Sequence, residues 1–192
     1  MDFFFVRDYR HRPRFFSAEP LGPLPAHFSK SRKIWETAKK KVTGLHPRTL
    51  LQEQAFERGG RADDGPVRIL HSGRADAHAL RSRFFFFLQR MRTRHVLLLA
   101  GEAVILPVSG LAALLPGPNI LFYALAILMV IQGQALRGIT RLLHKDHEFV
   151  ADPLLAEWEA AVEAGDEAGF TGILERLEKV HGLASARKIL WK

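Results

Sequence analysis

None of the 192 residues is a cysteine. This absence excludes disulfide bonds, thiolate catalysis and metal sites with cysteine ligands. The sequence also has no glycine-rich phosphate loop, no nucleophile elbow and no His-Glu-x-x-His segment, which mark large classes of enzymes. We therefore predict a protein without enzymatic activity, without a cofactor and without a resident metal.

Charged side chains are almost absent from residues 95–137, where Glu102 is the only one before Arg137. Two apolar runs, 96–115 and 120–136, are joined by four residues that cannot continue a helix: Pro116, Gly117, Pro118 and Asn119. At about 1.5 Å per residue the first run is roughly 30 Å long, the thickness of a bilayer's hydrocarbon core. We therefore predict a membrane-inserted helical hairpin with those four residues at its apex, and a shallower, non-crossing hairpin as the alternative.

Glu102 is the residue of this segment that most suggests a site. Folding the chain about the apex brings Glu102 opposite Gly133, between Gln132 and Gln134. A carboxylate at that depth is costly, so it is paired, protonated or functional. We predict a polar layer of Glu102, Gln132 and Gln134. This polar layer has two interpretations. Glu102 is either part of a proton or cation site, or a structural residue that hydrogen-bonds to Gln132 or Gln134 or extends toward the flanking Arg94 and Arg137.

The net charge of +8 is unevenly distributed. Residues 1–95 hold 20 Lys and Arg against 9 Asp and Glu, whereas residues 137–192 hold 8 against 10. Basic side chains at both ends of the hairpin predict contacts with anionic lipid headgroups, and they place both ends on the cytoplasmic or matrix side. The predicted headgroup contacts are Arg90, Arg92, Arg94, Arg137, Arg141 and Lys145. No nucleic-acid-binding motif accompanies the charge, so we expect no nucleic-acid partner.

Three regions organise the chain: a basic and mostly helical region at 1–94, the hairpin at 95–137 and an acidic helical tail at 138–192. The fold class is therefore mainly α. The first region contains basic amphipathic helices at 26–42 and 75–94. Residues 2–6 and 67–71 are short β-prone runs that pair, on this interpretation, as a small two-stranded β element.

The tail has clear helix boundaries. Asp152 can cap one helix that starts with Pro153 and ends at Gly165, and Asp166 can cap a second that ends at Gly182. In the first of these helices the glutamates are predicted on the face opposite the apolar one: Glu157, Glu159 and Glu163. We expect this acidic tail to dock on the basic front half of the chain.

His144 and His147 lie three residues apart near Asp146 and Glu148, a spacing compatible with a metal site. We interpret both histidines as polar residues at the membrane boundary.

The hairpin resembles the mitochondrial K+–H+ exchange-related family. The resemblance rests on Leu-Pro-Gly-Pro-Asn at 115–119, Phe122-Tyr123, the segment 134–138 and a preceding helical region with Trp35. It implies a link to potassium–proton balance across an energy-converting membrane, and it supplies no established catalytic residue.

Two helices per chain cannot enclose an ion path by themselves. We therefore expect a small integral membrane protein that contributes to potassium–proton homeostasis either as a homo-oligomer or as an accessory subunit of a membrane partner protein. The alternative is a non-transporting anchor or scaffold that binds anionic lipid or a protein partner. The expected location is a bacterial cytoplasmic membrane with both termini cytoplasmic, and the alternative is a mitochondrial inner membrane with both termini in the matrix.

Overall fold

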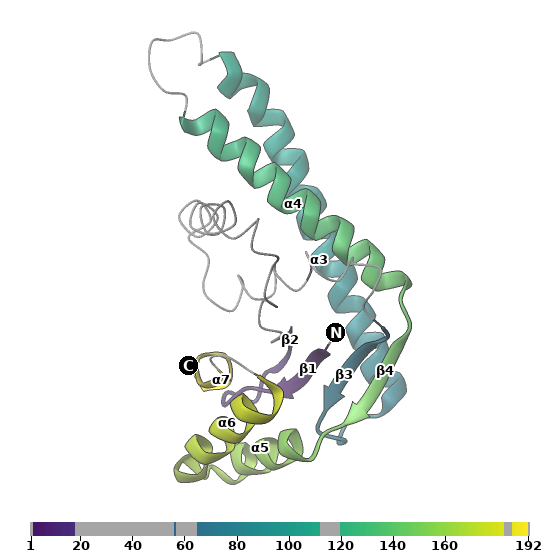
Figure 1. Ribbon diagram of the computed structural model, residues 1–192, viewed down its shortest axis with the longest axis vertical. Helices are drawn as coiled ribbons and strands as arrows, with labels where there is room; N and C mark the ends of the chain where they lie inside the picture. The colour runs from purple at the N-terminus through teal and green to yellow at the C-terminus, as the bar shows by residue number, and fades with distance from the viewer. Residues whose placement is uncertain (1, 18–55, 57–64, 112–119, 183–185, 192) are drawn as a thin grey trace, which may run out of the picture. The chain divides into compact units, whose positions relative to one another are not determined.

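The computed structural model describes residues 2–17, 56, 65–111, 120–182 and 186–191 (Figure 1). The predicted helix at 26–42 and the predicted apex at 116–119 lie outside these residues. The described strands are β1 (Asp2–Arg7), β2 (Pro13–Ser17), β3 (Val67–His71) and β4 (His147–Ala151). The described helices are α3 (Ala77–Leu111), α4 (Ile120–His144), α5 (Pro153–Ala164), α6 (Glu167–His181) and α7 (Ala186–Leu190).

The chain divides into two compact units. The first consists of Met1–Gly22, Arg61–Phe87 and Leu142–Lys192; it contains the sheet, and we also call it the sheet unit. The second consists of Pro23–Gly60 and Leu88–Arg141. Helices α3 and α4 each begin in one unit and end in the other, so each unit is described by itself.

The first unit is built on a four-stranded sheet in the order β2-β1-β3-β4. β1 pairs with β2 antiparallel and with β3 parallel, and β3 pairs with β4 parallel. The predicted pairing of residues 3–6 with 67–71 is present, but these strands form the centre of a larger sheet and not a separate ribbon. β1 is buried over its whole interior, from Phe3 to Val6, as expected of a central strand that is covered on both faces.

Phenylalanine side chains fix the layers on the two faces of the sheet. Successive residues of a strand point to opposite faces. Accordingly, the ring of Phe3 packs edge-on against Phe84 of α3, with 5.3 Å between centroids. The ring of Phe4 packs against His181 of α6 at 5.4 Å on the other face. The first turns of α3 therefore cover one face of the sheet, and the C-terminal helices cover the other.

The helix boundaries predicted for the tail are confirmed. The Asp152 side chain accepts a hydrogen bond from the Leu155 N–H at 3.0 Å, and Pro153 begins α5. Gly165 and Gly182 end α5 and α6 in the left-handed conformation, with φ of 67° and 63°. Both glycines suit this conformation because they have no Cβ atom.

The prediction of a mainly α, transmembrane protein with a membrane-inserted hairpin at 95–137 is wrong. Among the residues that the structure describes, no helix is both long enough and apolar enough to span a bilayer. Glu102 interrupts the apolar stretch of α3, and Gln132 and Gln134 end that of α4 after Ile131. The run 120–131 is only about 18 Å long at 1.5 Å per residue, against a hydrocarbon core of about 30 Å.

Candidate binding surfaces

The second unit exposes much of the apolar part of α3. Nine of the twelve residues from Val96 to Pro107 are exposed, and the three that are partly covered are Leu99, Glu102 and Leu106. These three recur at helical spacing, so they mark one inward face. The rest of the circumference is apolar and open, with Leu97 67% and Val104 73% exposed. A surface helix normally presents polar side chains there, so this face has the character of a binding surface.

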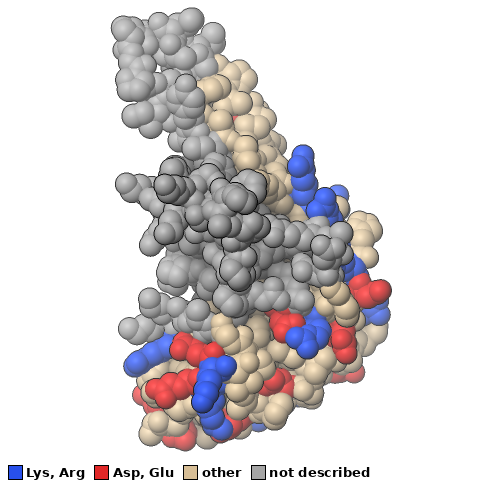
Figure 2. Space-filling model, in the orientation of Figure 1, with Lys and Arg blue, Asp and Glu red and all other residues tan. Residues whose placement is uncertain are grey.

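Arginines gather at one end of this apolar surface. Five of the six residues predicted to contact headgroups are exposed, namely Arg90, Arg92, Arg94, Arg137 and Arg141, and Lys145 is half-buried. His95 of α3 and Gln132 of α4 are hydrogen-bonded to each other. This contact places the basic end of α3 beside the basic end of α4. Figure 2 shows basic side chains (blue) beside the mostly uncharged surface (tan) of the helices. We call the exposed residues from Val96 to Pro107 together with these five arginines the helical surface.

The predicted polar layer consists of Glu102 on α3 and of Gln132 and Gln134 on α4, all in the second unit. Gln132 pairs with His95, which is fully buried and also lies edge-on against the ring of Phe56. Burial raises the pKa of Glu102. One carboxylate oxygen of Glu102 and the amide oxygen of Gln134 are buried without a hydrogen-bond partner among the described groups. The glutamate is therefore poised to hold a proton more readily than an exposed one.

His147 and His144 differ in surroundings. The ring of His147 packs edge-on against Phe84 and Phe85, with centroids 5.3 and 5.1 Å away. Burial, with a contribution from Arg81, lowers the pKa of His147 although the Leu142 carbonyl opposes the shift. His144 is exposed at the end of α4. Within the described ranges no group of three His, Asp or Glu side chains lies close enough to hold a metal ion.

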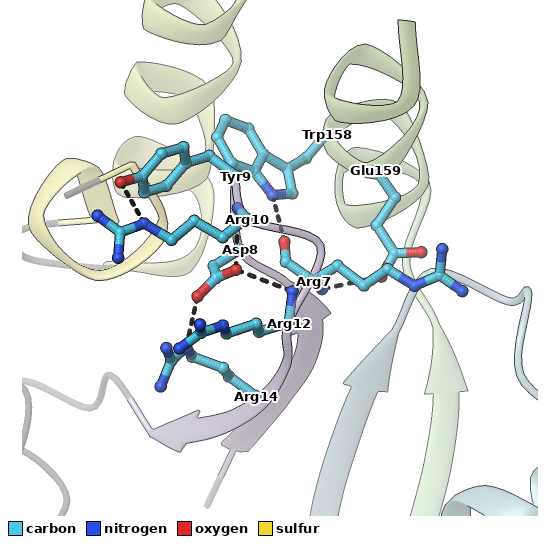
Figure 3. A network of polar contacts seen from close by, with 8 residues as sticks. All are labelled: Arg7, Asp8, Tyr9, Arg10, Arg12, Arg14, Trp158 and Glu159. Atoms are coloured by element: carbon cyan, nitrogen blue, oxygen red, sulfur yellow. Dashed lines mark hydrogen bonds and ion pairs between the residues drawn. The ribbon is translucent and has the colours of Figure 1, made fainter. Parts of the chain in front are cut away.

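The turn between β1 and β2 is organised by one carboxylate, Asp8 (Figure 3). Its Oδ1 accepts hydrogen bonds from the backbone N–H groups of Arg10 and Arg12 at 3.0 and 2.9 Å. Its Oδ2 accepts from Nε of Arg14 at 2.6 Å. Burial alone raises the pKa of Asp8, but these hydrogen bonds and the Arg14 charge outweigh it and lower the pKa. The turn is thus held in one shape by an ionised side chain.

A second buried carboxylate, Glu159 of α5, ties the ends of β1 and β3 together. Its two oxygens accept hydrogen bonds from the Arg7 N–H at 3.0 Å and from the Ser72 hydroxyl at 2.6 Å. Next to it, the indole N–H of Trp158 donates to the Arg7 carbonyl at 2.8 Å. Glu163 pairs with both Arg7 and Arg74. These contacts dock the acidic tail on the basic front half, as the sequence suggested.

Sequence reasoning missed Asp8 and Glu159 as organising residues. The prediction that Glu159 lies on the face of α5 opposite the apolar one is wrong, because Glu159 is only 3% exposed. The available signal was its spacing, because it follows Leu155 by four residues and precedes Val162 by three, which puts all three on one face of a helix. Asp8 had a weaker signal, a single acid within an arginine-rich turn.

Searches of protein-family models, curated proteins and solved structures gave no match to this chain. The resemblance to the exchange-related family therefore stays a prediction.

Proposed function

We propose that this chain is a non-catalytic anchor or scaffold protein that binds anionic lipid surfaces through the helical surface. The observation that carries this proposal is the open circumference of α3 from Val96 to Pro107, where nine of twelve residues are exposed and apolar or small. Such binding buries side chains at the surface of a bilayer and requires no helix that crosses it. Exposed apolar side chains gain roughly 25 cal/mol for each Å² removed from water.

The charge of the helical surface favours an anionic lipid over a second copy of the chain. From Ala77 to Lys145 the only acidic residue is Glu102, so the sequence of these two helices carries a strong excess of positive charge. A second copy would bring like charges together, whereas each arginine near an anionic membrane surface contributes about 1 kcal/mol. Long arginine side chains can also lay their apolar stems along the hydrocarbon boundary.

Co-sedimentation with lipid vesicles tests the proposal. We expect the full chain to bind vesicles containing phosphatidylglycerol strongly and vesicles of phosphatidylcholine alone weakly. The variant L97Q/V104Q, which changes two exposed side chains, should lose at least tenfold in affinity. The matched control is V180Q, which makes the same kind of change at an exposed valine of α6 in the first unit.

A triple variant measures how much the arginine charges contribute to lipid binding, separately from the apolar side chains. R90Q/R92Q/R94Q should weaken binding to the anionic vesicles, and R83Q/R176Q/R187Q, with three exposed arginines of the sheet unit replaced, should weaken it much less. Equal losses in the two triple variants, or binding that L97Q/V104Q leaves intact, would contradict the proposal. If the apolar variant instead dissociates an oligomer of the free protein, the helical surface binds a second copy.

An accessory role in potassium–proton balance is the second candidate. It is favoured by the resemblance and by Glu102, whose buried carboxyl has a raised pKa. Co-reconstitution with a membrane partner, followed by potassium-driven proton movement, is the test. Proton movement that is unaffected by E102Q would count against it.

A further inference from the structure

The turn between β1 and β2 displays more positive charge than its own carboxylate can balance. Figure 3 shows the side chains of Arg10, Arg12 and Arg14 extending in the same direction from this turn, past Asp8. Asp8 pairs with Arg14 through a 2.6 Å contact. Arg7, at the start of the turn, pairs with Glu163 at 3.2 Å. Two positive charges, those of Arg10 and Arg12, therefore remain without a carboxylate partner among the described residues.

The turn holds the backbone of these arginines and the side chains of Arg10 and Arg14 in place. Asp8 fixes the backbone at Arg10 and Arg12, and the backbone N–H of Tyr9 donates to the Leu190 carbonyl of α7 at 2.9 Å. Nε of Arg10 donates to the Tyr9 hydroxyl at 2.5 Å, and its guanidinium lies 5.0 Å from the centre of the Tyr9 ring. A ligand that binds here meets two guanidinium groups, those of Arg10 and Arg14, that are already held in place, which lowers the ordering cost of binding.

The turn lies at the edge of the sheet where the carboxyl ends of the three parallel strands meet. β1, β3 and β4 are parallel, so their carboxyl ends lie at one edge of the sheet. The turn follows directly on the carboxyl end of β1. In open sheets with parallel strands, ligands bind outside the carboxyl ends of the strands.

We propose that Arg10, Arg12 and Arg14 form a binding site for a phosphomonoester group. A phosphomonoester carries about −1.5 to −2 charges near neutral pH, which matches the two unbalanced arginines. Planar guanidinium groups bind phosphate oxygens with paired hydrogen bonds. Nε of Arg14 is engaged by Asp8, which leaves its terminal nitrogens for the ligand. This site lies in the sheet unit and is independent of the helical surface.

Calorimetric titration of the full chain with methyl phosphate, a soluble phosphomonoester, tests the site. We expect saturable binding, with much weaker binding of dimethyl phosphate, which carries a single charge. R12Q should weaken methyl phosphate binding about tenfold, the effect of losing one charged hydrogen-bonding partner. R14K keeps a positive charge beside Asp8 and should weaken binding less than R12Q.

The matched control is R176Q, because Arg176 is an exposed arginine of α6 that pairs with Glu157 away from the turn. It should bind methyl phosphate as the unchanged protein does. An equal loss in R176Q and R12Q, with both proteins folded by circular dichroism, would mean general charge attraction and would overturn the proposal.

Vesicles containing phosphatidic acid distinguish a lipid headgroup from a soluble phosphate. If R12Q weakens binding to phosphatidic acid but not to phosphatidylglycerol, the site accepts a lipid phosphomonoester. If R12Q affects methyl phosphate alone, the ligand is soluble. Absence of saturable binding to both methyl phosphate and phosphatidic acid would overturn the site and leave the proposed role of the helical surface unaffected.

Discussion

The Glu159 carboxylate accepts a hydrogen bond at 3.0 Å from the backbone N–H of Arg7, which lies 152 residues earlier in the chain. The same carboxylate accepts from the Ser72 hydroxyl, so one side chain of α5 joins the ends of two parallel strands. A carboxyl group that is only 3% exposed needs such partners, because burying a polar group without hydrogen bonds is costly. This contact holds together the edge of the sheet at which we place the phosphomonoester site.

Replacing Glu159 by Ala should therefore destabilise the sheet unit. The Arg7 N–H would lose its acceptor near the protein interior, and we expect a loss of about 2–4 kcal/mol in the free energy of unfolding. Urea denaturation followed by circular dichroism measures it. E157A is the control on the same helix. Among the described residues Glu157 forms an exposed ion pair with Arg176, and such pairs contribute about 0–1 kcal/mol. Similar losses in both variants would contradict the role of Glu159.

Replacing Asp8 by Asn should destabilise the turn at neutral pH by about 1–3 kcal/mol, because the amide presents a donor to Nε of Arg14. The pKa of Asp8 is lowered in the folded protein relative to 3.8. Its stabilising contribution is therefore complete above pH 4 and is lost as the pH falls through the folded pKa. The difference in stability between D8N and the unchanged protein should shrink below pH 4. A constant difference down to pH 2 would show that ionisation of Asp8 is unimportant.

Glu102 should show the opposite dependence. Burial raises the pKa of Glu102 above 4.5 in the folded protein. The neutral carboxyl therefore contributes fully to the stability of the fold below pH 4.5, and this contribution is lost as the pH rises through the folded pKa. E102Q keeps the neutral form at every pH. We expect E102Q to raise the Tm at pH 7.5 and to leave it unchanged at pH 4. E148Q, at an exposed position of β4, should change the Tm little at either pH.

His71 should make the sheet unit less stable in mild acid. Burial lowers its pKa below 6.5 against the opposing charge of Glu159, and its Nδ1 accepts a hydrogen bond from the Gly73 N–H at 3.0 Å. The unfolded chain therefore takes up the proton first, and stability is lost as the pH falls below about 6.5. H71N keeps an acceptor but cannot titrate, so its Tm should fall less between pH 7 and pH 5. The exposed His78 supplies the control H78N, which should behave as the unchanged protein does.

Sequence reasoning succeeded where the determining contacts are local. The caps of α5 and α6 were predicted because Asp152 and Asp166 bond to N–H groups three residues away, and Gly165 ends the helix through its own backbone conformation. For the sheet it predicted the pairing of β1 with β3 but missed β2 and β4, which extend the sheet on either side. Neither missed strand stands out in the sequence: β2 begins with Pro13 in an arginine-rich segment, and β4 contains His147 and Glu148.

The sequence alone determined that residues 95–137 are apolar with a single acid, that basic residues flank them, and that two capped helices follow. It did not determine what surrounds the apolar residues. The composition sets how much free energy is gained when apolar side chains leave water, but it does not specify which partner covers them. The tertiary structure decided that Glu102 faces inward on α3 and that Leu97 and Val104 stay exposed. It also decided that Glu159 is buried, since only the folded chain brings Arg7 and Ser72 within hydrogen-bonding distance of its carboxylate.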